Sequence, residues 1–80
     1  MGLMMRTIFC VQPYRRSAEG LRKGHLRRLL SRDAAIRAAR AMKAHEDGVI
    51  VFRVTGCPEA DFWTDPVMIA RAGDTPQLDA

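Results

Sequence analysis

Residues 32–47, RDAAIRAARAMKAHED, form the one segment of this 80-residue chain with a clear helical pattern. It contains six alanines and neither glycine nor proline, and alanine has the highest helix propensity. Ser31 is a suitable N-cap, Asp33 lies where its charge favours the helix dipole, and Gly48 is expected to cap the C-terminus. A helical projection places Ala35, Ala38, Ala39, Met42 and His45 on one face and Arg32, Arg37, Arg40 and Lys43 across the other. With one helix, the chain must complete its core with strands.

Short apolar segments rich in β-branched and aromatic residues lie on both sides of this helix and predict strands. The predicted strands are residues 7–14 (TIFCVQPY), 26–30 (LRRLL), 49–55 (VIVFRVT) and 67–72 (VMIARA). Pro13 cannot donate a ladder hydrogen bond, which places that end of the first strand at a sheet edge or just past it. Residues 15–25 are expected to form a long loop or hairpin tip, and residues 56–65 a turn-rich, acidic connection.

The order β-(β)-α-β-β predicts an α+β fold, with one amphipathic helix packed on a three- to four-stranded, mainly antiparallel sheet. The length predicts a single domain, residues 1–80, with frayed ends at residues 1–5 and 74–80. No apolar run approaches the roughly 18 residues of a membrane-spanning helix, so we expect a cytoplasmic protein without membrane contact. Two cysteines are too few for a disulfide scaffold and are expected to be thiols.

The predicted strands carry apolar side chains on both faces, whereas a single helix can cover only one face of a sheet. Either residues 15–30 fold over the second face or another copy of the chain covers it. The second alternative predicts a homodimer that buries Val49, Val51 and their neighbours, or the equivalent face of the first strand.

Positive charge is concentrated between residues 15 and 43. This segment contains ten basic and two acidic residues, which give a net charge of +8. The rest of the chain carries a net charge of −4. This asymmetry is typical of a polyanion-binding surface, and arginine, which predominates, suits bidentate phosphate contact. The candidate nucleic-acid-binding residues are Arg15, Arg16, Arg22, Lys23, Arg27, Arg28, Arg37, Arg40 and Lys43. An acidic protein is the alternative partner, and a solvated surface without a partner has the same composition.

Residue patterns for catalysis or metal binding are missing from the sequence. The spacing of Cys10, His25, His45 and Cys57 contains no paired metal-binding motif. Cys57 has acidic neighbours, which raise a thiol pKa, and Cys10 is expected to be a small core residue. The glycines of residues 20–24, GLRKG, match no phosphate-binding loop. We therefore expect a protein that is not an enzyme and that uses no cofactor and no metal.

Residues 48–76, GVIVFRVTGCPEADFWTDPVMIARAGDTP, place a Gly-Val strand, an acidic turn with proline and tryptophan, and a short strand after the alanine-rich helix. This order resembles small uncharacterised bacterial proteins of α+β type. The resemblance covers about half of the chain and implies a fold but no activity and no site residue. Two functions are consistent with the sequence: a small non-catalytic module that binds polyanions such as nucleic acid, or a homodimeric interaction module that uses an apolar sheet face.

Overall fold

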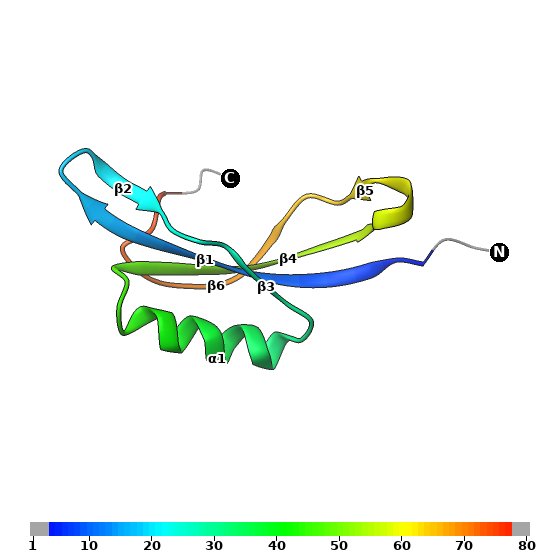
Figure 1. The fold of residues 1–80 in the computed structure, drawn as a ribbon, viewed down its shortest axis with the longest axis horizontal. Coiled ribbons are helices and arrows are strands. Elements are labelled where there is room, and N and C mark those ends of the chain that lie inside the picture. The colour runs from blue at the N-terminus through cyan, green and yellow to red at the C-terminus, as the bar shows by residue number, and fades with distance from the viewer. Residues whose placement is uncertain (1–3, 78–80) are drawn as a thin grey trace.

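The computed structural model describes residues 4–77, and it confirms the predicted α+β class and the order of the main elements. The elements are β1 (Arg6–Ser17), β2 (Gly20–Lys23), β3 (Arg27–Leu29), α1 (Arg32–Lys43), β4 (Gly48–Cys57), the 3₁₀ turn η1 (Pro58–Ala60), β5 (Phe62–Trp63) and β6 (Val67–Gly73). One helix packs on an antiparallel sheet that curls strongly away from it at both ends (Figure 1).

The six strands of the sheet occupy four rows. β1 and β4 pair along the centre, from Arg6 opposite Gly56 to Tyr14 opposite Gly48. β2 and β3 follow one another along the outer side of β1 and form one interrupted edge. β5 and β6 do the same along the outer side of β4. All of these pairs are antiparallel, so the predicted three- to four-stranded arrangement is confirmed in its rows, although each outer row is broken in two.

The core lies between α1 and the two central strands. It consists of Val11, Ala35, Ala38, Ala39, Val49 and Val51. Val11 and Val51 are 0% and 1% exposed, because the alanines facing them have no side chain beyond Cβ and let the helix approach the sheet closely. The small-residue face predicted for the helix is therefore the face that packs.

Local hydrogen bonds explain where the helix begins and where it ends. Ala34 donates its backbone N–H to Ser31 Oγ at 3.1 Å, which confirms the predicted N-cap. The helix ends at Lys43, one turn earlier than predicted, where the N–H groups of His45 and Glu46 both bond to the carbonyl of Met42. Gly48 is not the C-terminal cap, because it is the first residue of β4.

Residues 15–25 were predicted as a long loop or hairpin tip, and the structure contains the hairpin, with most of the segment in regular strands. β1 continues to Ser17 and returns as β2 after a tight turn, in which Gly20 has a φ of 116°. Ser17 Oγ donates to the Gly20 carbonyl at 2.9 Å and accepts from the Glu19 N–H. Exposed edge pairing needs no apolar alternation, so the charged sequence did not indicate how far the two strands extend. Residues 56–65 likewise contain the end of β4, η1 and β5.

Pro13 is an interior residue of the central strand β1, not a residue at a sheet edge, and it lies opposite Val49. The position is tolerated because the outer row is interrupted beside it, between β2 and β3. Gln12 closes this interruption: its Nε2 donates to the carbonyl of Gly24 at 2.8 Å, and the Gly24 N–H donates to the Pro13 carbonyl at 2.9 Å.

No helix in residues 4–77 has the length and apolarity needed to cross a membrane. Of the ends predicted to be frayed, residues 1–3 and 78–80 lie outside the described residues. Asp74 follows β6 directly and donates its N–H to the Asp47 carbonyl at 2.8 Å.

Candidate functional site

The hairpin of β1 and β2 gathers four of the candidate cations around a hollow of about 350 Å³. They are Arg15, Arg16, Arg22 and Lys23, and Arg15 lies directly opposite Arg22 in the strand register. The turn that follows α1 borders the same hollow through Glu46. The structure therefore brings together a first subset of the residues predicted from sequence.

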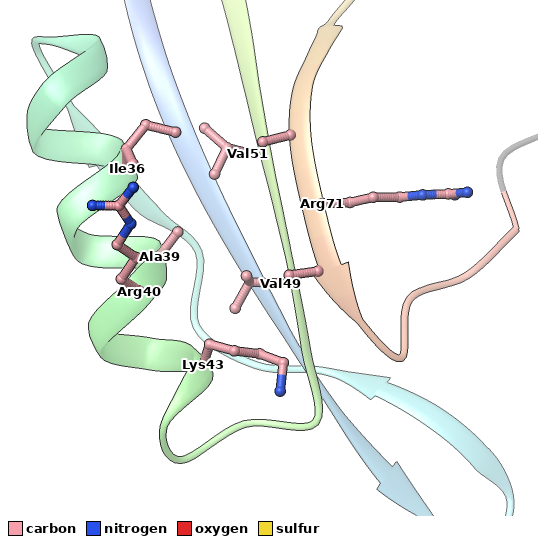
Figure 2. Close-up of a pocket in the computed structure, with 9 residues that line it drawn as sticks. Ile36, Ala39, Arg40, Lys43, Val49, Val51 and Arg71 are labelled. Carbon is pink, nitrogen blue, oxygen red and sulfur yellow. The ribbon is translucent and has the colours of Figure 1, made fainter.

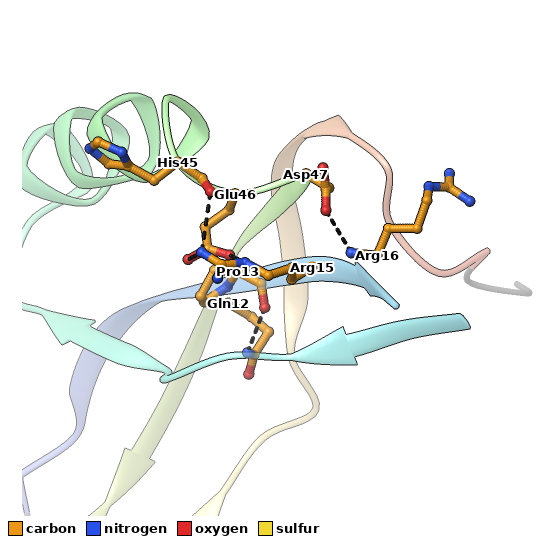
Figure 3. Close-up of polar contacts among 7 residues, drawn as sticks. All are labelled: Gln12, Pro13, Arg15, Arg16, His45, Glu46 and Asp47. Carbon is orange, nitrogen blue, oxygen red and sulfur yellow. Dashed lines mark hydrogen bonds and ion pairs between the residues drawn. The ribbon is translucent and has the colours of Figure 1, made fainter. Parts of the chain in front are cut away.

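Two of these four cations form ion pairs with acidic side chains of the same chain. Arg15 Nη2 lies 3.2 Å from Glu46 Oε1 and also donates to the His45 carbonyl (Figure 3). Arg16 Nη2 lies 2.8 Å from Asp74 Oδ2, and this hydrogen bond raises the pKa of the Arg16 guanidinium. Within residues 4–77, these are the two ion pairs. Arg22 and Lys23 are the hairpin cations left to contact a ligand.

The remaining candidates lie elsewhere and do not form one surface. Arg27 pairs with Val11 and Arg28 with Cys10, so these neighbouring arginines are on opposite faces of the sheet. The other three candidates, Arg37, Arg40 and Lys43, are exposed on α1. The predicted basic surface is thus divided among the hairpin, β3 and two sides of α1, because Arg40 and Lys43 lie on the side of the helix toward β6.

A groove of about 300 Å³ runs between α1 and β6 on the helix side of the sheet (Figure 2). It exists because α1 lies over β1 and β4 and leaves the helix-facing side of β6 uncovered. Its lining residues are Ile36, Ala39, Arg40, Lys43, Val49, Val51, Ala70, Arg71 and Ala72. Most of this lining is aliphatic and none of it is acidic.

Two cations stand on the helix side of this groove. Arg40 and Lys43 both line it, and Figure 2 shows the Lys43 side chain extending from α1 toward the strands. That side chain passes so close to Gly73 that a Cβ there would stand 2.5 Å from Lys43 Cε. Arg71 points away from the helix. Arg40 lies further along α1, with its guanidinium near Ile36 (Figure 2). The groove thus combines an apolar floor with two cations at separate points of its helix side.

Val49 and Val51 belong to the floor of this groove and to the core, not to an uncovered face. They are 3% and 1% exposed and point toward α1 (Figure 2), so a second copy cannot contact them while the helix is in place. The alternation of β4 puts the leftover apolar residues, Ile50, Phe52 and Val54, on the opposite face.

This opposite face, the open face, is a hollow of about 460 Å³. It is lined by Ile8, Cys10, Leu26, Arg28, Phe52, Val54, Pro58 and Trp63. Residues 15–30 do not fold over it, because β2 and β3 pair along the edge of β1 instead. The hairpin and β5 curl above its two ends (Figure 1). Trp63 stacks against Gly56, where any side chain would collide with the indole ring.

The two cysteines are buried, and neither is paired in a disulfide. Burial raises the pKa of the Cys10 thiol, and the charge of Arg28 opposes this shift in part. Burial also raises the pKa of Tyr14. A hydrogen bond from its own backbone N–H lowers the pKa of the Glu59 carboxyl group, and Cys57 Sγ, which donates to Glu59 Oε2 at 3.2 Å, lowers it further. Neither thiol is therefore in the electropositive, accessible setting of a reactive cysteine.

No group of three or more metal-ligating side chains gathers within residues 4–77. His25 and His45 are both exposed, so the inner-face position predicted for His45 is wrong: the helix has ended two residues before it. Comparison of the chain with protein-family models, with curated proteins and with solved structures finds no match.

Sequence reasoning did not identify the groove between α1 and β6. The signal was present in the helix, since Ile36 lies at about the same angle as Arg40 and Lys43, away from the buried alanines. A lone apolar residue among cations on a helix flank indicates a second, smaller contact. What faces that flank depends on the order of strands in the sheet.

Proposed function

We propose that this protein is a small non-catalytic module that binds polyanions, nucleic acid in particular, through the β1–β2 hairpin and the outer side of α1. The observation that carries the proposal is the set of cations without an ion pair in residues 4–77. Arg22 and Lys23 on the hairpin and Arg37 on the helix are exposed, and no acid compensates them.

The arrangement supports phosphate contact without reading of bases. The hairpin and the C-terminal end of α1 lie at the same end of the molecule (Figure 1), and a phosphate backbone bound there can continue along α1 to Arg37 in the middle of the helix. With a single helix among residues 4–77 and a short hairpin, the site has no element shaped to enter a groove and read base edges. Binding is expected to be electrostatic and nearly independent of nucleotide sequence.

The test is a titration of the full chain with two unrelated duplexes and one single-stranded oligonucleotide at 50 and 200 mM salt. Three phosphate contacts predict a slope of log K against log salt of about −2.7 on duplex DNA. The double variant Arg22→Ala, Lys23→Ala should weaken binding of every sequence and reduce the slope by about two. The charge-matched control Arg6→Ala, Arg53→Ala removes two cations at the other end and should change the slope far less.

Asp74→Asn sharpens this test, because it removes the carboxylate that forms the ion pair with Arg16. The freed guanidinium should strengthen oligonucleotide binding and steepen the salt slope by up to about one. Absence of binding at 50 mM salt, or equal losses in the hairpin variant and its control, would contradict the proposal.

A second candidate function is self-association through the open face. Leu26, Trp63 and Met68 are 36%, 40% and 45% exposed around the apolar floor, and exposed apolar patches mark interaction sites. A homodimer through this face predicts that Leu26→Arg lowers the mass measured by light scattering at high micromolar concentration. A parent chain that is monomeric at that concentration would exclude this function.

A further inference from the structure

The two edges of the sheet are protected to different degrees against pairing with another strand. β2 and β3 together have seven residues, of which four are arginine or lysine, and they are separated by the break at residues 24–26. Charges and interruptions are the devices by which edge strands avoid new partners. β6, Val67–Gly73, has one charge in seven residues and pairs with β4 from Val67 to Gly73, with one register shift at Ile69. Its outer backbone groups have no strand partner within residues 4–77.

The groove between α1 and β6 lies on the helix side of this unprotected edge. A strand added beside β6 would continue the sheet, and every second side chain of it would point toward the helix. Those side chains would lie beside Ile36 and Ala70 near the middle of β6 and beside Lys43 and Gly73 at its end. The site therefore offers apolar contact along most of its length and positive charge at the C-terminal end of β6.

We propose that β6 and the groove between α1 and β6 form a recognition site for an extended peptide segment of another protein, which adds to the sheet as a strand and carries apolar side chains with one acidic side chain on its helix-facing side. Main-chain hydrogen bonds to β6 supply affinity, and the groove supplies specificity. In the favoured antiparallel orientation, the acidic side chain is near the N-terminus of the segment, beside Ala72 and Gly73.

Charge argues for such a partner and against a second copy of the chain at this edge. Two copies joined antiparallel through β6 would have both helices on the same side of the joined sheet. The added strand would then be the β6 of the second copy, which has one arginine and no acidic residue. A second copy therefore brings no carboxylate to Lys43 through this strand, whereas an acidic peptide segment does.

The probe is an acetylated and amidated seven-residue peptide, Thr-Glu-Thr-Val-Thr-Val-Thr, titrated into the isotopically labelled full chain and followed by amide chemical shifts. Its matched control has lysine in place of glutamate. The shifts should move in β6 and on the groove side of α1, and the lysine peptide should bind at least about fivefold more weakly. Equal binding of the two peptides would overturn the proposal.

Strand addition has a further signature that contact through side chains alone does not have. The amides of an added strand point alternately toward β6 and away from it. N-methylation of every second residue should therefore abolish binding in one of the two sets of positions and leave it nearly unchanged in the other. Equal binding of both methylated sets, or loss in both, would exclude a strand added to β6.

Variants of the protein separate this site from the polyanion surface. Arg40→Ala with Lys43→Ala keeps a strong helix former at exposed positions and should weaken binding of the glutamate peptide at least about threefold. Arg22→Ala with Lys23→Ala removes the same charge from the hairpin and should leave peptide binding unchanged while it weakens oligonucleotide binding. If both doubles weaken peptide binding equally, the peptide is held by net charge and the site is wrong.

Discussion

The two outer rows of the sheet are built from similar lengths of strand but differ in their charge and in the surface beside them. The row of β2 and β3 carries four cations, and the hollow beside β2 is lined mainly by basic side chains. In the other outer row, β6 has one charge in seven residues and borders the uncovered flank of α1. The position of the helix causes the second difference, because α1 packs over β1 and β4 and leans toward β3. One edge is thus suited to phosphates and the other to a peptide strand.

The largest expected effect concerns the glycines that shape the two edges. A Cβ on Gly48 would collide with the backbone of Asp74, which closes the end of β6. A Cβ on Gly20 would meet open space, although its φ of 116° is unfavourable for other residues. Gly48→Ala should therefore lower the free energy of unfolding by about 3 kcal/mol, and Gly20→Ala by about 1 kcal/mol. Urea denaturation followed by circular dichroism measures both, and equal losses would contradict the close packing at Gly48.

The second prediction removes the protection of the basic edge. Arg22→Val with Lys23→Val makes β2 apolar and β-prone while the hairpin register stays the same. The variant should self-associate, so that its mean mass by light scattering rises with concentration well above that of the parent chain. Arg22→Gln with Lys23→Gln is the control, since it removes the charges without adding apolar surface. A monodisperse valine variant would show that charge is not what distinguishes the two edges.

A smaller effect is expected from the helix cap, which supports the groove without touching either edge. Ser31→Ala leaves the Ala34 N–H without its hydroxyl acceptor and should lower the free energy of unfolding by about 1 kcal/mol. Ser31→Asp keeps an acceptor and should restore most of the loss. Since both variants leave the charges of the two edges in place, the preference of each edge for its ligand should not change.

The smallest effect concerns pH and the thiol of Cys10, next to the basic edge. Burial raises its pKa in the folded chain, so above the unfolded thiol pKa of about 8.5 the unfolded chain loses this proton first. The contribution of Cys10 to stability is complete below that pH and is lost as the pH rises through the folded pKa. Thermal unfolding between pH 7 and 10 should show a steeper decline for the parent chain than for Cys10→Ala. Parallel declines would exclude the linkage.

The elements defined by local chemistry could be predicted from the sequence. Ser31 fixed the start of the helix, and the apolar run of β4 identified the central strand. A hairpin tip was one of the two alternatives for residues 15–25, but the lengths of β1 and β2 could not be predicted, because their paired ends are exposed and show no apolar alternation. The helix end was missed because its last turn closes through bonds to Met42, and Gly48 is required by the approach of Asp74, 26 residues further along the chain.

The candidate sites likewise contain features that the sequence predicts and features that depend on the tertiary fold. The sequence located the cations but not their ion-pair partners. Glu46 and Asp74 form ion pairs with Arg15 and Arg16 because the fold brings the helix end and the end of β6 to the hairpin. Val49 and Val51 were assigned to a dimer interface because alternation defines two faces of a strand without saying which one a helix covers. The groove beside β6 depends on strand order, and strand order is a property of the whole chain.

The central claim, that the two edges take chemically different ligands, is tested most directly by one spectroscopic experiment. Amide chemical shifts of a single labelled sample are recorded with the glutamate peptide, with a duplex oligonucleotide, and with both together. The account predicts that the peptide moves resonances of β6 and the groove side of α1, that the duplex moves those of the hairpin and the outer side of α1, and that each binds in the presence of the other. Displacement of one ligand by the other, or the same shifted residues for both, would contradict it.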